Sequence, residues 1–201
     1  LERNQSIVRE RTLPDAQDVL SYENDVHDVT FHVPYRWDIT EGQGDFISVK
    51  MVPGEMEHNA WKFIEKSDFI PQVLVGSEKR NSHELTNDAL STGFFSITSG
   101  DAPEILSNYI FTNDKGQQAH LSITTQNIQE GDETIKFKVL QLHFNNSENN
   151  YSVIYVNTAD YFRYEVNAFS YTVDNFEIMI DGEMQKLGFF ERPVFQQLMK
   201  D

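Results

Sequence analysis

The sequence predicts an α+β domain built on a central antiparallel sheet of about six strands with helices on both faces, an α/β/α sandwich. Three observations support this prediction. Residues 29–38 alternate apolar and polar side chains and then meet a proline and a tryptophan, as expected where a strand enters a packed domain and turns a corner. Three alternating segments follow one another between residues 119 and 157. An aromatic amphipathic segment at residues 160–176 then predicts a helix that packs on the sheet.

The N-terminal segment differs in composition from the rest of the chain. Residues 1–26 are polar and charged, and they predict an arm or linker with one helical turn at residues 15–20. Residues 27–201 are predicted to form a single α+β domain.

The domain is predicted to open with a strand in which Val29, Phe31 and Val33 share one face. Residues 46–52 alternate in the same way and predict a second strand. Because Gly42 and Gly44 lie between the two segments, we expect the strands to pair as a hairpin.

The region from residue 53 to residue 118 mixes apolar segments with turn residues. Helical spacing predicts a helix at residues 56–66, and an apolar run predicts a short buried strand at residues 71–76. Residues 77–91 are polar and predict a loop, and residues 92–98 predict a further strand. Asp101 is a suitable N-cap for a helix that would carry Ile105, Leu106, Tyr109 and Ile110.

The C-terminal half predicts a meander, a helix and a short hairpin. Residues 119–128, 134–144 and 151–157 predict three strands, and a change of apolar parity near Val139 predicts a β-bulge in the second of them. The helix at 160–176 has an apolar stripe of Phe162, Val166, Phe169 and Val173. Residues 176–180 predict a strand closed by the turn dipeptide Asp181-Gly182, and residues 192–200 predict a last amphipathic helix.

Composition disfavours several classes of function. The net charge is −16, with 32 acidic and 16 basic residues, which disfavours binding to nucleic acid or to anionic lipid. The sequence has no cysteine, so disulfides, zinc–cysteine sites and thiol nucleophiles are excluded. No apolar run approaches the roughly 18 residues of a membrane-spanning helix.

The chain contains no serine-nucleophile elbow, no phosphate-binding loop and no HExxH pattern, so no catalytic residue is predicted. The histidines His32, His120 and His143 fall at polar positions of predicted strands, where a shared face with a carboxylate would suit a metal ion. Polar strand faces often carry single histidines, so we expect three separate exposed histidines, no metal site and no cofactor.

The corner after the first predicted strand supplies the candidate binding residues. Trp37 is predicted to be a core anchor, because large aromatic side chains mostly bury. Its neighbours Tyr35 and Arg36 are predicted to line the rim of a ligand groove if the corner is exposed.

The order of these elements resembles the PsbP-like family, which includes the extrinsic photosystem protein PsbP, a Ran-binding import factor and bacterial exported lipoprotein domains. The resemblance rests on Pro34 and Trp37 after the first strand, on the meander of residues 119–157, and on the helix that closes with residues 174–177. It spans residues 27–180. Asn175 stands where the family often has serine, and residues 53–118 are longer than the family pattern.

This resemblance implies a non-catalytic accessory or binding domain, exported from a bacterial cell, with a protein partner. It implies an extracytoplasmic location, periplasmic or as a cell-surface lipoprotein, while a cytoplasmic location stays open. Two alternatives follow from the residues. One is a metal-dependent enzyme that uses the histidines on the sheet face, and the other is a small-molecule carrier with an apolar pocket between sheet and helix.

Overall fold

The structure is a computed structural model, and it describes residues 6–12, 18–42, 47–54, 69–80, 97, 100–112 and 118–188. These residues form strands, one 3-10 helix and one α-helix. In chain order they are β1 (Ser6–Thr12), β2 (Asp18–Asn24), β3 (Val29–His32), β4 (Trp37–Glu41), β5 (Ile47–Pro53), β6 (Gln72–Lys79), β7 (Glu104–Thr112), β8 (Gln118–Glu130), β9 (Glu133–Asn145), β10 (Asn149–Thr158), η1 (Ala159–Tyr161), α3 (Phe162–Asp174), β11 (Glu177–Ile180) and β12 (Glu183–Lys186).

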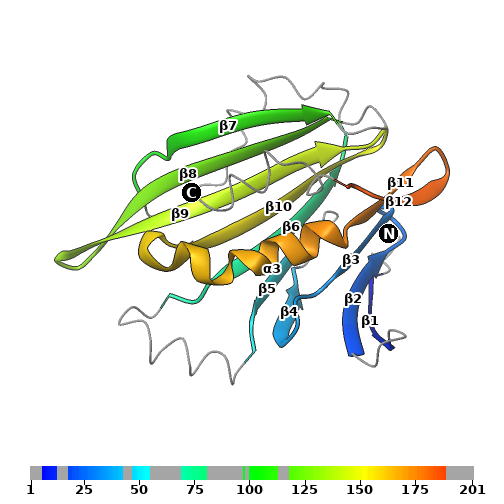
Figure 1. Cartoon of the computed structure of the whole chain (residues 1–201), viewed down its shortest axis with the longest axis horizontal. Coiled ribbons are helices and arrows are strands. Elements are labelled where there is room, and N and C mark those ends of the chain that lie inside the picture. Colours follow the sequence, from blue (N-terminus) through cyan, green and yellow to red (C-terminus); the bar gives the residue numbers. More distant parts are fainter. Residues whose placement is uncertain are drawn as a thin grey trace.

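The strands form two antiparallel sheets (Figure 1). The larger sheet has seven strands in the order β4-β5-β6-β10-β9-β8-β7, and the smaller has five in the order β1-β2-β3-β11-β12. Helix α3 crosses one face of the larger sheet and packs against β10 and β3, so it contacts both sheets (Figure 1).

The predicted antiparallel sheet and its covering helix are confirmed, but the single sheet of about six strands is wrong. A separate sheet exists because the hairpins β1–β2 and β11–β12 pair with β3 from either side. The described residues are mostly strand, with one α-helix on one face of the larger sheet. The helices predicted at residues 56–66 and 192–200 lie outside the described residues, so helices on both faces stay a prediction.

The N-terminal segment is not a free arm over residues 18–24. Strands β1 and β2 pair along their whole length, and β2 pairs in turn with β3. Tyr22 is fully buried, and its ring stacks on Phe31 at 4.9 Å between centroids. The helical turn predicted at residues 15–20 is therefore wrong for residues 18–20, because sheet pairing and this ring contact outweigh local propensity. The division of the chain into domains stays a prediction.

The predicted corner is confirmed, but its strands pair differently from the expected hairpin. Strand β3 ends at His32 and pairs with β2 and β11, whereas the predicted partner β5 pairs with β4 and β6. Trp37 begins β4, so the corner carries the chain from the smaller sheet into the larger one. Trp37 is 7% exposed and belongs to the core, as predicted.

The predicted helix after Asp101 is wrong, because residues Glu104–Thr112 form strand β7. Its apolar pairs, Ile105 with Leu106 and Tyr109 with Ile110, are spaced like a helical stripe. In the structure they lie on an edge strand that buries neither face fully, so the alternation typical of a half-buried strand is missing.

The meander of β8, β9 and β10 is confirmed, and the predicted bulge in β9 is wrong. The register passes Val139 without a shift. The parity changes because the two ends of β9 are buried on opposite faces. Leu140, Leu142 and Phe144 belong to the main core under α3, whereas Phe137 and Val139 belong to a second cluster on the other face.

The remaining elements follow the predictions closely. All four residues of the apolar stripe on α3 are buried. Strands β11 and β12 form the predicted hairpin, and Asp181 and Gly182 in its turn have φ of 53° and 84°. Strand β6 extends the strand predicted at residues 71–76 to Lys79, so the loop predicted at residues 77–91 is wrong for residues 77–79, where the chain pairs with β5 and β10. The strand predicted at residues 92–98 lies outside the described residues except for residue 97, which is not in a strand.

Candidate binding surfaces

The predicted binding residues Tyr35 and Arg36 form the exposed tip of the corner between β3 and β4. Tyr35 is 66% exposed, and the Arg36 guanidinium carbon lies 5.1 Å from the centre of its ring. Arg36 has a φ of 62°, a left-handed conformation that is uncommon for residues with a side chain. The corner therefore presents an aromatic ring and a cation together at the surface.

Neighbouring backbone holds this corner in place. The N–H of Trp37 donates to the Pro34 carbonyl at 3.0 Å, and the N–H of Gly54 donates to the Arg36 carbonyl at 2.7 Å. A β-carbon at Gly54 would lie 2.8 Å from that carbonyl oxygen, so only glycine fits there without a shift. Because the next residue, Trp37, is buried in the core, the chain is held in place immediately after the exposed pair.

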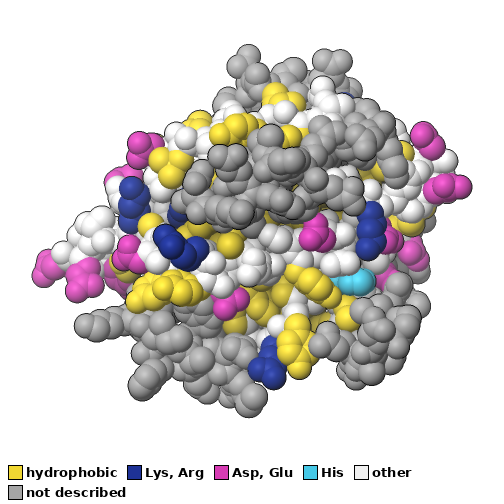
Figure 2. All heavy atoms as spheres, viewed as in Figure 1, with side chains coloured by type: hydrophobic (Ala, Val, Ile, Leu, Met, Phe, Trp, Pro, Cys, Tyr) yellow, Lys and Arg dark blue, Asp and Glu magenta, His cyan; other side chains and the backbone are white. Residues whose placement is uncertain are grey.

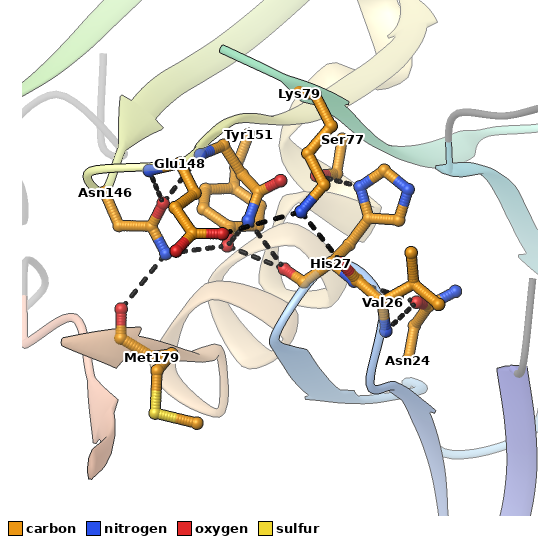
Figure 3. A network of polar contacts seen from close by, with 10 residues as sticks. Asn24, Val26, His27, Ser77, Lys79, Asn146, Glu148, Tyr151 and Met179 are labelled. Carbon is orange, nitrogen blue, oxygen red and sulfur yellow. Dashed lines mark hydrogen bonds and ion pairs between the residues drawn. The ribbon is translucent and has the colours of Figure 1, made fainter. Parts of the chain in front are cut away.

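A buried polar network joins the two sheets near the β9–β10 turn (Figure 3). At its centre, the hydroxyl of Tyr151 donates to the His27 carbonyl at 2.8 Å. The same hydroxyl accepts from the side-chain amides of Asn146 at 3.1 Å and Asn149 at 3.2 Å. Asn146 also donates to the carbonyl of Met179 at 3.0 Å, which ties in strand β11.

The other side of the network fixes the turn between β2 and β3. The side-chain oxygen of Asn24 accepts from the backbone N–H groups of Val26 and His27 at 3.0 and 3.1 Å. The His27 ring lies 3.0 Å from the hydroxyl of Ser77, and Lys79 donates to the Val26 carbonyl at 3.1 Å (Figure 3). Strand β6 of the larger sheet is thereby bonded to a turn of the smaller sheet.

We interpret this network as structural. Burial raises the pKa of Tyr151 above its usual range, so its hydroxyl stays protonated and keeps donating to a backbone carbonyl. In the sequence, residues 145–150 lie between two predicted strands, where a turn is expected. The asparagines in that turn were the available signal, since asparagine side chains commonly bond to nearby backbone.

The structure brings two of the three predicted histidines together. His120 and His143 are directly opposite on β8 and β9, with ring centroids 6.4 Å apart, whereas His32 lies in the smaller sheet beside Tyr171. His120 is 1% exposed rather than exposed as expected, and its ring hydrogen-bonds to Asn108. Burial lowers the pKa of His120, and burial together with the His120 charge lowers that of His143 to about 4.

These two histidines do not form a metal site with the part of the chain that the structure describes. Nowhere in that part do three or more His, Asp or Glu side chains gather in an arrangement suited to a metal ion. Two neutral imidazoles packed in a sheet account for the observed geometry, with His120 hydrogen-bonded to Asn108 and His143 to Gln141.

Strand β7 carries a surface that the sequence did not reveal as a site, since these residues were assigned to a helix. Hydrophobic side chains are visible along the rim of the larger sheet where β7 runs (Figures 1 and 2). The exposed fractions of its large apolar residues are 48% for Ile105, 51% for Leu106, 38% for Tyr109 and 47% for Ile110. We call these four residues the β7 surface.

Comparisons with known proteins support the fold. No protein-family model matches the chain, and no curated protein matches it. The described architecture is a PsbP-like fold. Among solved structures, the solution structure of cyanobacterial PsbP from Synechocystis sp. PCC 6803 is similar, with a TM-score of 0.52 and 14% identity. That match covers 80% of this chain and 92% of the other. Among the described residues, no helix has the length and hydrophobicity needed to cross a membrane.

Proposed function

We propose that this chain is a non-catalytic accessory domain that binds another protein, and that the β7 surface is its main contact. The observation that carries this proposal is the exposure of four large apolar side chains within one strand. Large apolar side chains exposed close together on a domain commonly mark an interaction site. Burying the exposed half of one such side chain would contribute about 1 kcal/mol to binding.

The corner formed by Tyr35 and Arg36 is proposed as a second contact. Tyrosine and arginine are enriched among the residues that dominate binding energies, and a fixed base lowers the entropy lost on binding. The buried Trp37 and the bond from Gly54 to Arg36 provide such a base.

An extracytoplasmic location, in the periplasm or on the cell surface as a lipoprotein, belongs to this proposal. The PsbP-like fold and the sequence resemblance to exported lipoprotein domains support it. The absence of cysteine is compatible with either side of the membrane. The metal-dependent alternative finds no ligand cluster among the described residues.

The test compares partner capture by three forms of the tagged chain in its source organism. Leu106→Lys places a charge in the β7 surface, and Met184→Lys is the matched control, because Met184 is 39% exposed on the edge strand β12. Quantitative mass spectrometry should find proteins that the wild type and Met184→Lys retain and Leu106→Lys loses. Identical protein sets for Leu106→Lys and the wild type, with unchanged melting temperatures, would contradict the proposal.

A further inference from the structure

We infer that the partner docks as an extended segment that adds a strand to β7, and that this segment is apolar with a basic residue at one end. This inference rests on the proposed protein-binding function and specifies how the β7 surface would be used. The occupant is a segment of another protein.

The position of β7 makes main-chain pairing possible. β7 is the last strand of the larger sheet, and its described partner is β8 on one side. The register with β8 shifts between Ile105 and Ser107 and is regular from residue 107 to residue 112. An added strand would therefore pair along residues 107–112, with Leu106 displayed at the bulge.

Exposure on both faces of β7 favours a strand over a helix as the occupant. Tyr109 pairs with Leu121, which belongs to the main core, and the next residue Ile110 pairs with His120. Successive side chains of a strand point to opposite faces. A helix or a flat surface lying on one face would cover Tyr109 or Ile110 but not both, whereas an added strand has side chains on both faces.

The composition of β7 also distinguishes it from the other edge strands. Protective edges usually carry lysine, proline or several charges. β7 has one charged residue, Glu104, in 9 residues. The other three edges carry more: β1 has three charged residues in its sequence SIVRERT, β4 has Asp38 and Glu41, and β12 has Glu183 and Lys186 within 4 residues. β7 is thus the least protected edge for strand addition among them.

Charge determines the chemistry of the partner. Glu104 opens β7, and the backbone N–H of Asp101 donates to the Asn127 carbonyl at 3.0 Å, so both acidic residues are placed at the same end of the strand. Both side chains are exposed. A lysine or arginine on the partner segment beside Glu104 would complement them. A second copy of this chain would bring a further net charge of −16, which disfavours self-pairing.

The experiment uses fluorescent peptides as long as β7, 9 residues, that alternate valine and threonine and carry two lysines at one end. Binding to the full chain is measured by fluorescence anisotropy. The same peptide with two glutamates should bind about tenfold more weakly, equivalent to about 1.4 kcal/mol. Methylating one backbone nitrogen at a time should weaken binding at every second residue, because alternate N–H groups of a strand point towards its neighbour.

Matched variants locate the site. Glu104→Lys should abolish the preference between lysine and glutamate peptides, because Asp101 remains as its counter-charge, whereas Glu183→Lys on β12 should retain the preference. Leu106→Lys should weaken both peptides, and Met184→Lys should leave both unchanged. A methylation scan without alternation, or no binding of any peptide to the wild type, would overturn strand addition.

The outcomes separate this inference from the proposed function. If the methylation scan is flat but Leu106→Lys still loses a partner in the source organism, protein binding through the β7 surface stands and strand addition fails. Self-association that Leu106→Lys abolishes would identify a second copy as the occupant and overturn the inferred partner. If no protein depends on Leu106 in the source organism, the proposed function fails, whatever the peptides do.

Discussion

Tyr151 provides a quantitative test of the polar network between the two sheets. Replacing it with phenylalanine keeps the ring, which packs 5.3 Å from Phe144 and 6.2 Å from Phe176, and removes the hydroxyl. The His27 carbonyl then loses its 2.8 Å donor, and the amides of Asn146 and Asn149 each lose one acceptor. Because the ring and its contacts stay, the change in stability reports on the hydrogen bonds of the hydroxyl.

The expected loss is moderate because every partner retains one bond. Asn149 still donates to the His27 carbonyl at 3.3 Å, and Asn146 still donates to Met179 at 3.0 Å. We therefore expect Tyr151→Phe to lower the free energy of unfolding by about 2 kcal/mol, within the range for a buried bond left unmade. For a chain of this size that corresponds to a fall of about 4–8 °C in melting temperature.

The assay is urea and thermal unfolding followed by tryptophan fluorescence and circular dichroism. Tyr35→Phe is the matched control, because the same atom is removed from a side chain that is 66% exposed, and it should change stability by less than about 0.5 kcal/mol. Equal stabilities of Tyr151→Phe and Tyr35→Phe would refute the reasoning, since the network would then contribute nothing measurable.

Two further predictions concern the histidine pair and the corner. The pKa of His143 falls from 6.5 in the unfolded chain to about 4 on folding, so the unfolded chain binds the proton first as the pH is lowered. The contribution of His143 to the free energy of unfolding should therefore be largest above pH 6.5 and decrease by about 3 kcal/mol as the pH falls to 4. Urea titrations of His143→Gln should lack this part of the slope, while His32→Gln should retain it; parallel profiles for wild type and His143→Gln would contradict the assignment. Gly54→Ala should cost about 1–3 kcal/mol, because the new methyl meets the Arg36 carbonyl at 2.8 Å, whereas the exposed Thr40→Ala on β4 should change thermal stability little. Equal melting temperatures for these two variants would show that the corner shifts without cost.

The elements that the sequence predicted well are those whose apolar residues recur with a regular period. The stripe on α3 and the alternation of Ala119, Leu121 and Ile123 on β8 each place apolar residues in the main core, so periodicity identifies them. Periodicity did not identify β7 as a strand, because both of its faces stay partly exposed. Periodicity did not identify β2 either, because a single large core residue, Tyr22, does not form a repeating pattern.

The candidate sites were predictable to different degrees. Tyr35 and Arg36 lie between a proline and a tryptophan, so the local sequence indicated a corner, and the structure adds that its tip is exposed. The polar network was not predictable, because its members come from a turn and from strands of two different sheets that only the packed fold brings together: His27, Ser77, Tyr151 and Met179. The β7 surface could have been found only by recognising that Ile105 and Leu106 are adjacent apolar residues. In a strand, such neighbours leave neither face polar.

Strand β9 sets an unusual constraint on how this protein can vary. Its central residues have no free face, since Phe137 and Val139 fill the cluster on one side and Leu140 and Leu142 fill the core on the other. Phe137 and Leu142 lie in different clusters and well apart along the strand, so the effects of substitutions at these two positions should combine nearly additively. Tolerated substitutions in β9 are therefore those that preserve the apolar volume on each side of the strand separately. The edge strands are not under this constraint, so their sequences can change together with those of their binding partners.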